Sequence, residues 1–353
     1  MSERNAHAWM LADLHAVPKI GVRVMSTFAC GGGSTMGYKR AGCDVIAAND
    51  IDAEMAWHYK TNHRPQHYFL CPIRDLLTAD LPAELFDLDI LDGSPPCSTF
   101  SMAGSREDAW GVDKHFREGQ AKQVLSDLFF DFLDLAARLR PRVVIAENVK
   151  GMLLGNAKGY TRKVMQRLRE IGYRPQLFLV NAADCGVPQR RERVFFCAVR
   201  DDISAPPLQL APQHRWVSAC EATSDLQSLT PSEIAETVPS PEALQHWRTT
   251  VHGQSFAASK KAATGKATGY GRIRLAANAP ASTLTACVTD FYHATECRRL
   301  TLREWKRLGS FPDDYAAKSD RLGKYLIGMS VPPKMTEAVA RAVCTQWLGK
   351  VAQ

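Results

Sequence analysis

The chain has 353 residues, of which 45% are hydrophobic and 23% charged, and its formal net charge is +7. This composition is that of a globular protein with one large domain and a smaller one. No apolar run approaches the roughly 20 residues of a membrane span, and the first residues lack the apolar core of a signal peptide, so we expect a cytoplasmic protein without a membrane partner. The positive charge permits an acidic partner such as nucleic acid, and it becomes evidence only where it clusters.

The ten cysteines form no C-x-x-C pair, and none has a histidine at zinc-ligand spacing. Cysteines used in this way are typical of free thiols in a reducing compartment. We therefore expect neither disulfides nor a metal site. His58, His63 and His67 are expected in solvent and carry no predicted function.

The first half of the chain alternates between strand and helix patterns. Residues 21–28 predict a buried strand, and a helix over 34–41 is expected after the glycine-rich turn 29–33. Glycines let backbone amides approach a ligand, and a helix amino terminus offers unpaired N–H groups to an anion. Taken alone, such a turn is weak evidence for a ligand site.

A second strand over 45–52 strengthens this interpretation, because it ends in acidic residues about 20 positions after the glycines. In nucleotide-binding α/β folds a carboxylate at this place bonds the ribose hydroxyls. Asp50 is the candidate for that role, and Ile51 could lie against an adenine face. The alternative is a simple Asn-Asp turn.

A thiol follows the next predicted strand. The apolar run 88–92 stops at Gly-Ser-Pro-Pro, and Cys97 comes directly after the second proline. Because prolines have a fixed φ and no amide hydrogen, Cys97 is expected on a stiff loop at the carboxyl end of the strand, where open α/β sheets bind ligands. A buried free cysteine in a turn is the alternative. The polar segment 102–123 predicts either a lid or a disordered insertion.

A carboxylate follows one strand later. The sequence predicts a helix over 125–139, a buried strand over 143–146, and Glu147-Asn-Val149 just after that strand. On adjacent strand ends, this carboxylate and Cys97 can converge. A strong nucleophile beside a proton donor suits attack on an electron-poor ring that is protonated elsewhere.

Eight short motifs are distributed along the chain. Five of them are Phe28-Ala-Cys-Gly-Gly-Gly33, Asn49-Asp-Ile-Asp52, Gly93-Ser-Pro-Pro-Cys97, Glu147-Asn-Val149 and Gln189-Arg-Arg-Glu-Arg193. The other three are Asn181 to Pro188, Arg299 to Glu304 with Phe311-Pro-Asp313, and Gly328 to Pro333. They occur in the order seen in DNA (cytosine-5) methyltransferases, and the chain resembles the prokaryotic members of that family almost end to end. One Pro-Cys pair would mean little, whereas eight ordered motifs indicate the family.

The resemblance implies a role for each matching residue. Cys97 would be the nucleophile that adds to C6 of a cytosine flipped out of the duplex, and Glu147 would hydrogen-bond its N3 and amino group. Arg191 and Arg193 would steady the base and Glu147. The implied methyl donor is S-adenosylmethionine, and the matching cofactor positions are Phe28, Cys30, Gly31, Gly32, Gly33, Asp50, Ile51, Ile73, Pro96, Leu128, Met329 and Ser330.

Four positions depart from the family pattern. Cys30 stands where glycine is usual, and Pro72 stands where an aspartate that contacts the adenine amine is common. Met329 replaces the usual asparagine, and Ser98-Thr99 replaces Gln-Pro after the cysteine. We expect these changes to affect the affinity and pose of the cofactor while the catalytic set stays intact.

Composition divides the chain into two predicted domains. A doubly wound, Rossmann-like α/β cofactor domain is expected over 18–200, completed by 322–353 with a helix over 335–348. Prolines interrupt the small target-recognition domain, 201–321, so that no long helical period survives there.

Within the small domain, segment 245–275 is basic, free of acidic residues and interleaved with aromatic ones, which is typical of phosphate contact and base readout. A flexible basic linker is the alternative. The expected DNA-binding residues are Gln189, which precedes this domain, and Arg248, Lys260, Lys261, Lys266, Arg272 and Arg274.

The sequence thus predicts an enzyme that methylates a specific site in double-stranded DNA, acts in the cytoplasm on the nucleoid and requires no oligomer. The DNA sequence read and the presence of a cognate restriction endonuclease stay open. Two other functions also stay open: a transfer-RNA cytosine-5 methyltransferase, which would share the catalytic apparatus, and a DNA-binding accessory subunit without turnover. An enzyme that methylates amino groups would need an aromatic residue in place of Cys97.

Overall fold

The computed structural model describes residues 5–96, 128–155, 157–212, 214–226, 228–266, 268, 271–286 and 291–351. Cys97, Ser98-Thr99 and the predicted lid 102–123 lie outside these residues. The chain forms two compact units. The sheet unit comprises Ala16–Val180, Glu192–Ala211 and Thr336–Gln353, and the helical unit comprises Met1–His15, Asn181–Arg191 and Pro212–Met335.

A seven-stranded sheet forms the centre of the sheet unit, with the strand order β3-β2-β1-β4-β5-β7-β6. Strands β1 to β5 pair in parallel, whereas β7 runs antiparallel to β5. The order reverses between β1 and β4, which is the switch point where doubly wound sheets bind ligands. The predicted fold class is confirmed. The strands are β1 (Arg23–Thr27), β2 (Asp44–Asp50), β3 (His67–Leu70), β4 (Ile90–Gly93), β5 (Val143–Val149), β6 (Tyr173–Asn181) and β7 (Glu192–Arg200).

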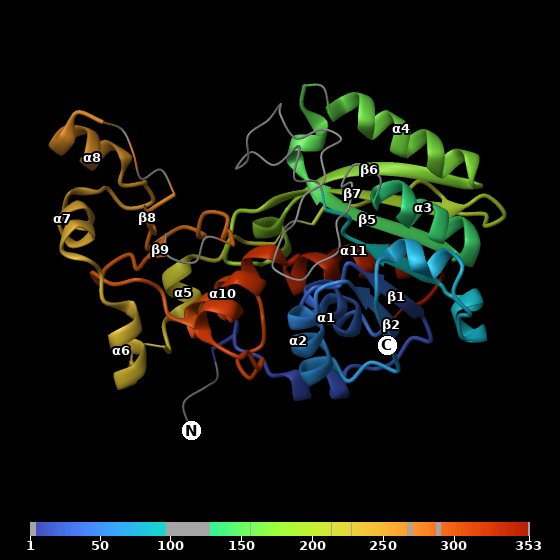
Figure 1. Cartoon of the computed structure of the whole chain (residues 1–353), viewed down its shortest axis with the longest axis horizontal. Helices are drawn as coiled ribbons and strands as arrows, with labels where there is room; N and C mark the ends of the chain where they lie inside the picture. The colour runs from blue at the N-terminus through green and yellow to red at the C-terminus, as the bar shows by residue number, and fades with distance from the viewer. Residues whose placement is uncertain are drawn as a thin grey trace. The chain divides into compact units, whose positions relative to one another are not determined.

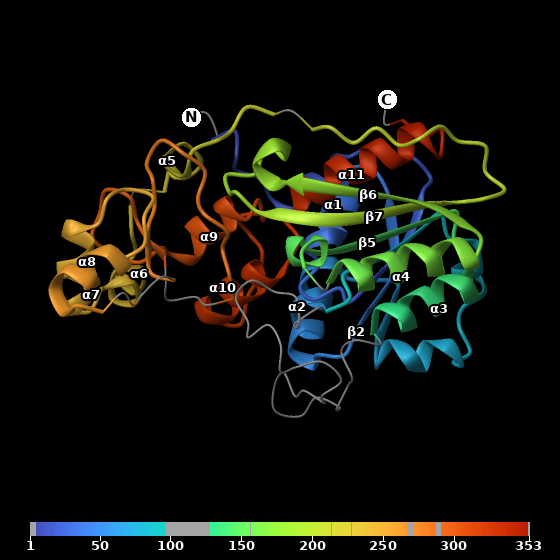
Figure 2. The same cartoon turned by 90° about the horizontal axis from the view of Figure 1, so that it is seen from above.

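Helices cover both faces of this sheet. Figures 1 and 2 show α3 and α4 on one face and α1 and α11 on the other. An ion pair of 2.6 Å between Arg40 Nε and Glu337 Oε2 joins α1 to α11. The long helices are α1 (Gly33–Arg40), α2 (Ala53–His63), α3 (Leu128–Leu139), α4 (Ala157–Glu170) and α11 (Pro333–Gln346). Short 3-10 turns are η1 (Leu11–Ala16), η2 (Ile73–Leu77), η3 (Ala83–Asp87), η4 (Lys150–Leu153) and η5 (Ala182–Cys185).

Two local predictions are wrong. Glu147 and Asn148 lie within β5 instead of after it, because β7 pairs with β5 along its whole length, as far as Val149 opposite Arg193. His58 and His63 lie in the interior, with 0% and 6% of their surface exposed, instead of in solvent. Both are on the inner side of α2, which begins after Asp52 because the Asp52 carboxylate accepts the amide hydrogens of the first helical turn.

The helical unit consists of short helices and one small sheet, as Figure 1 shows. Apart from Ala257–Thr264, which begins after Phe256 without a side-chain cap, the helices that lie wholly in this unit begin after serine or threonine caps, which satisfy free N–H groups of the first turn. No helix among the described residues is both long and apolar enough to span a bilayer. The elements are α5 (Ala219–Thr223), α6 (Pro231–Thr237), α7 (Pro241–Thr249), α8 (Ala257–Thr264), β8 (Ile273–Arg274), β9 (Phe291–Tyr292), α9 (Leu302–Leu308) and α10 (Asp320–Met329).

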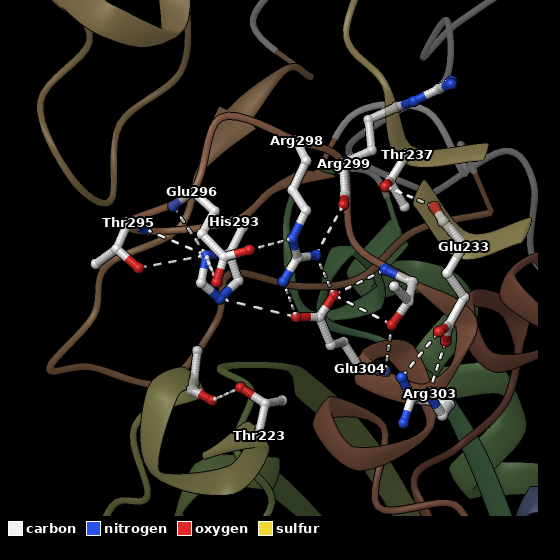
Figure 3. A network of polar contacts seen from close by, with 12 residues as sticks. Thr223, Glu233, Thr237, His293, Thr295, Glu296, Arg298, Arg299, Arg303 and Glu304 are labelled. Atoms are coloured by element: carbon white, nitrogen blue, oxygen red, sulfur yellow. Dashed lines mark hydrogen bonds and ion pairs between the residues drawn. The ribbon is translucent and has the colours of Figure 1, made fainter. Parts of the chain in front are cut away.

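A buried charge network fixes the segment between β9 and α9 (Figure 3). The Arg298 guanidinium donates two hydrogen bonds of 2.8 Å to the Glu304 carboxylate, which is 2% exposed. Glu304 also closes a capping box with Thr301 at the start of α9, and His293 Nε2 lies 3.7 Å from it. A buried carboxylate is stable only when it is paired and hydrogen-bonded, and Glu304 is both.

The two compact units cut the chain at different places from the predicted domains. Residues 181–191 and α10 group with the helical unit. The cause is hydrogen bonding: Gln189 bonds Leu308, and Arg191 bonds Leu284 and Gly328. The functional division into a cofactor domain and a target-recognition domain stays a prediction. The compact units differ from it in that residues 181–191 and α10 lie outside the sheet unit.

Candidate active site

Three parallel strands lie side by side at one edge of the sheet, where β1 and β4 end and β5 continues for three more residues. Thr27 of β1 is in register with Gly93 of β4, and Gly93 is in register with Ala146 of β5. The next residues along the three strands therefore lie at the same level of the edge: Phe28 opens the glycine turn, Ser94 opens the proline loop, and Glu147 carries the carboxylate. The motifs predicted to act together meet at the switch point of the sheet.

Glycine is the one residue type that fits at position 93, where the proline loop starts. A Cβ atom there would lie 2.6 Å from the Phe132 ring and 2.6 Å from Thr27 Oγ1. Both neighbours are buried, Phe132 in α3 and Thr27 in β1, so neither has room to move away. The close approach of α3 and β1 explains why the loop begins with glycine.

Glu147 is 7% exposed and pairs with Arg193 of the neighbouring strand β7, at 2.9 Å between Oε1 and Nε. Burial lowers the pKa of Arg193, and the charge of Glu147 counteracts that effect. The pair fixes the carboxylate at the edge of the sheet and compensates the desolvation of both groups. This contact is the one that the predicted role of Arg193 requires, and the role itself stays a prediction.

Asn148 tethers the proline loop to β5. Its Nδ2 donates a buried hydrogen bond of 3.0 Å to the Pro95 carbonyl oxygen, while its Oδ1 accepts from Val149 N at 2.8 Å. Both polar ends of the amide are therefore used, which fixes its orientation. The loop that leads to Cys97 is consequently held against the strand that carries Glu147.

The glycine turn after β1 contains three residues in the left-handed region, Phe28, Cys30 and Gly32, with φ of 51°, 48° and 85°. A side chain in this region costs roughly 1–2 kcal/mol, so the cysteine in the usual glycine position strains the turn. His63 supports the turn from below: its Nε2 donates to the Gly31 carbonyl oxygen at 3.2 Å, and a Cβ on Gly32 would lie 2.2 Å from the same nitrogen.

The role of His63 is one that the sequence did not reveal. Burial, and then the charge of Lys39, lower the pKa of its imidazole to about 3, so the ring is neutral at physiological pH. A neutral ring can donate from Nε2 to a carbonyl without bringing a buried charge to the turn. No local pattern marks this histidine, because its position depends on how α2 packs against the sheet.

Asp50 joins the end of β2 to the glycine turn. Its Oδ2 accepts a hydrogen bond of 2.7 Å from Cys30 N, and its Oδ1 accepts one of 2.9 Å from Asp52 N. Burial raises the pKa of Asp50, and these amides counteract the shift. Asp50 thus forms the Asn-Asp turn that was the alternative to a ribose contact. A carboxylate has about four acceptor sites, so the turn does not prevent a bond to a ribose hydroxyl.

Apolar residues predicted to contact the cofactor share one cluster beside this edge. Ile73 and Leu128 are 3% and 5% exposed, and Phe28 packs against the same cluster. Ile51 and Pro96 are half-buried. Pro72 directly precedes η2 and offers no carboxylate, so an adenine amine would have to find another acceptor.

Three further predicted residues belong to the helical unit. Arg191 is 3% exposed, and its guanidinium donates to the carbonyl oxygens of Leu284 at 2.8 Å and Gly328 at 3.1 Å. Met329 ends α10 with 52% of its surface exposed, and Ser330 is buried with its hydroxyl bonded to Leu326 O. Arg191 therefore holds the segment before Met329 in shape, which is a structural role alongside the predicted one.

Half of the predicted DNA-binding residues in segment 245–275 are engaged inside the helical unit. Lys260 Nζ lies 2.7 Å from a Glu242 carboxylate oxygen, and Arg272 Nη1 lies 3.5 Å from the other one. Arg274 stacks on the Trp247 ring at 3.8 Å from its centroid and donates to three carbonyl oxygens of the helical unit. These contacts, together with α8 and β8, contradict the alternative of a flexible linker.

The other cations of the segment are Arg248, Lys261 and Lys266, which are exposed and make no ion pair among the described residues. Gln189 is 1% exposed, and its side-chain amide bonds Leu284 N and Leu308 O. Gln189 therefore joins two segments of the helical unit, and its predicted contact with DNA stays a prediction.

Comparisons with known proteins agree with this geometry. The family model of C-5 cytosine-specific DNA methylases matches residues 22–345. The type II methyltransferase M.NgoPII of Neisseria gonorrhoeae is 27% identical over 340 residues, covering 91% of this chain and 95% of that protein. M.AplI of Arthrospira platensis is 30% identical over 332 residues, covering 91% of this chain and 85% of its own length.

Solved structures show the same fold. A prophage-encoded protein of E. coli, described as a DNA modification methyltransferase, superimposes with a TM-score of 0.70 at 20% identity, covering 92% of this chain and 99% of that one. Spodoptera frugiperda DNMT2 superimposes with a TM-score of 0.62 at 16% identity, with coverages of 92% and 99%. With the family model matched over nearly the whole chain, the protein belongs to the C-5 cytosine-specific DNA methylase family.

Proposed function

We propose that this DNA cytosine methyltransferase acts through a covalent bond between Cys97 and C6 of a cytosine flipped out of duplex DNA. The observation that carries the proposal is the buried Glu147–Arg193 pair at the end of β5, next to the proline loop that Asn148 tethers. The pair presents a fixed carboxylate beside the loop that leads to Cys97. This is the arrangement that addition to a ring with protonation of the same ring requires.

The proposed reaction proceeds in balanced steps. The Cys97 thiolate forms a bond to C6, and the electrons of the C5–C6 double bond move into the ring as Glu147 hydrogen-bonds and protonates N3. C5 becomes electron-rich and would take the methyl group, whose bond to its donor would break. The C5 hydrogen then leaves as a proton, the electrons reform the C5–C6 double bond, and the thiolate departs. N3 finally returns its proton to the Glu147 carboxylate, so the base and the side chain are both restored. The task of Arg193 is to hold the Glu147 carboxyl in place throughout.

The proposed methyl donor is S-adenosylmethionine, which supplies an activated methyl group when bound. The residues present fit such a molecule: the left-handed turn places backbone N–H groups at the start of α1, and Asp50 supplies a carboxylate for ribose hydroxyls at the end of β2. Phe28, Ile73 and Leu128 supply an apolar wall. In this assignment, Asp50 orients the ribose, and the apolar wall excludes water from the ring.

The proposed DNA contacts of the helical unit centre on Arg248, Lys261 and Lys266, which are exposed. Exposed cations without a protein partner can replace counterions at phosphates without first breaking an ion pair. Lys260 and Arg272 would have to leave Glu242 to do the same, so their share of the binding energy is smaller. Arg274 is assigned to the fold of the unit.

We further propose that the enzyme acts on the nucleoid in the cytoplasm and has a cognate restriction endonuclease as a partner in modification. The support is the naming of its relatives as type II methyltransferases. Enzymatic methylation sequencing of DNA from an expressing host tests the function and gives the site in one step. We expect 5-methylcytosine at one short sequence; methylation of transfer RNA alone, or of no nucleic acid, would contradict the proposal.

A further inference from the structure

A buried carboxylate lies beneath the active-site edge and takes no part in the reaction steps above. Asp92 is in β4, one residue before Gly93, and is 3% exposed. Its Oδ2 accepts a hydrogen bond of 2.8 Å from Ser26 Oγ of β1, and its Oδ1 accepts one of 3.0 Å from the Tyr38 hydroxyl of α1. Three elements thus meet on one carboxyl group.

The position of this cluster relates it to both functional loops. Ser26 is two residues before Phe28, which opens the glycine turn, and Tyr38 belongs to the helix that follows that turn. Asp92 is five residues before Cys97 in the sequence, and its own carbonyl oxygen accepts from Thr27 Oγ1 at 3.0 Å. The cluster therefore ties the end of the cofactor strand β1 to the end of the nucleophile strand β4.

We propose that Asp92 is a positioning residue for methyl transfer: as a carboxylate it locks the ends of β1 and β4 together through charge-assisted bonds from Ser26 and Tyr38, and as a neutral acid it holds them less firmly. A carboxylate accepts from both hydroxyls, whereas a carboxylic acid donates a hydrogen of its own, so one hydroxyl becomes the acceptor and both bonds lose the assistance of the charge. The inference rests on the proposed function.

The titration of Asp92 falls in the physiological range. Burial raises its pKa to about 7; the hydroxyls of Ser26 and Tyr38 oppose the shift, and the charge of Glu147 on β5 adds to it. The other groups around the cluster with a shifted pKa are Tyr38 itself, Tyr59 of α2, Cys197 of β7 and Cys43, which directly precedes β2. Burial raises the pKa of the first three, and the Cys344 thiol together with burial raises that of Cys43. All four stay neutral, so Asp92 is the one of these five groups that titrates near neutral pH.

The pH dependence of the stability that Asp92 contributes distinguishes a functional role from a purely structural one. The folded-state pKa of Asp92 is raised above its ordinary value, so its contribution to stability is present at acid pH and is lost as pH rises through about 7. At alkaline pH the ionised side chain therefore destabilises the fold. A residue that weakens the protein under working conditions and sits at the edge of the site is typical of a functional requirement.

Asp92→Asn is the central variant, because asparagine keeps the shape of the neutral acid and cannot ionise. Calorimetry measures S-adenosylmethionine binding at about pH 6 and about pH 8, on either side of the titration. For the native enzyme we expect binding several-fold weaker at the lower pH. Asp92→Asn should bind equally at both pH values, at the weaker native affinity. Its melting temperature at the higher pH should exceed that of the native enzyme.

Two control variants define the result. Asp89→Asn changes the same residue type just before β4, where Asp89 accepts from Arg23 N, and should keep the native pH dependence. Ser26→Ala removes one bond and leaves the carboxylate, so binding should weaken at the higher pH while some pH dependence remains. Lys39, whose pKa burial lowers to about 8, is present in every variant and cannot cause a difference between them.

The outcomes are distinct. Asp92→Asn with the full native pH dependence would overturn the inference, as would a lower melting temperature at about pH 8, which would give Asp92 a purely structural role. A native enzyme that binds no S-adenosylmethionine at either pH would instead overturn the proposed function. A pH-independent, stabilised and weakly binding Asp92→Asn would support the positioning role.

Discussion

The active-site edge of the sheet unit and the basic segment of the helical unit organise charge in opposite ways. At the edge, the buried Glu147 pairs with Arg193, whose side chain is 15% exposed, so each charge has one fixed partner. In segment 245–275, Lys261 and Lys266 point into solvent while Lys260 is held by Glu242. Paired buried charges fix geometry, which chemistry needs; exposed unpaired charges provide attraction, which a phosphate backbone needs.

Because the charges are organised differently, substitutions in the two regions should affect different measured quantities. A substitution at the edge removes a side chain that is held in a single position, so it should lower the rate of methyl transfer. A change in the basic segment removes one of several weak attractions and should appear in the salt dependence of DNA binding.

The largest effect is expected for Glu147→Gln, which removes the acid and leaves Arg193 facing a neutral partner. Loss of one general acid should lower the single-turnover rate of methyl transfer by roughly 10²- to 10⁴-fold. Lys150→Met is the matched control, because it removes the exposed Lys150–Glu192 pair of 2.8 Å just after the same strand. Equal rates for Glu147→Gln and the native enzyme would sink the assignment of Glu147.

The next effect is expected for Asp50→Ala. Loss of a charge-assisted bond to a ribose should weaken S-adenosylmethionine binding by about 1.5 to 3 kcal/mol. The turn also loses the bond to Cys30 N, which adds to the effect. Calorimetry makes the measurement, and Asp44→Ala at the other end of β2 is the control, since Asp44 pairs only with Lys19 among the contacts described for its side chain. Unchanged affinity would retire the ribose assignment.

Much of the active-site edge could be predicted from the sequence, because its strands are apolar runs that end at prolines, glycines or charges. Two features could not. β5 extends through Glu147 because β7, more than 40 residues later, pairs with it in antiparallel register. His63 supports the glycine turn because α2 packs over the sheet, and no local pattern encodes that contact. Long-range pairing decided both.

The basic segment was less predictable for a related reason. The sequence shows six cations and no acid between 245 and 275, but the partner of Lys260 and Arg272 is Glu242, three residues before that range. The partners of Arg274 are carbonyl groups and the Trp247 ring. Composition counts charges, whereas folding decides which of them remain available to a ligand.

A smaller effect is expected for the exposed lysines. Replacing Lys261 and Lys266 with alanine should lower the slope of log affinity against log salt by roughly 0.9 for each phosphate that the protein no longer neutralises. Lys260→Ala should change the slope less, because Lys260 is already paired with Glu242. Fluorescence anisotropy at several salt concentrations makes the comparison. Equal slopes for all variants would remove the segment from the DNA interface.

The smallest effect is expected for Thr301→Ala, which removes one side of the capping box of α9. Loss of a helix cap typically costs about 1 kcal/mol. Hydrogen exchange should show faster opening at the start of α9, with no change at β4 and β5 in the sheet unit. Faster exchange at those strands would mean that the two units do not open separately.

The covalent step is the central claim, and a fluorinated substrate tests it most directly. Fluorine at C5 of the target cytosine cannot leave as a proton, so the thiolate cannot be released after methyl transfer. With S-adenosylmethionine and duplex DNA that carries 5-fluorocytosine at the methylated site, the native enzyme should stop as a methylated adduct that survives denaturing electrophoresis. Cys97→Ser should give no adduct, because serine is a far weaker nucleophile without a dedicated base, and Glu147→Gln should form it slowly. A native enzyme that methylates the normal site and is never trapped on the fluorinated one would contradict the covalent route.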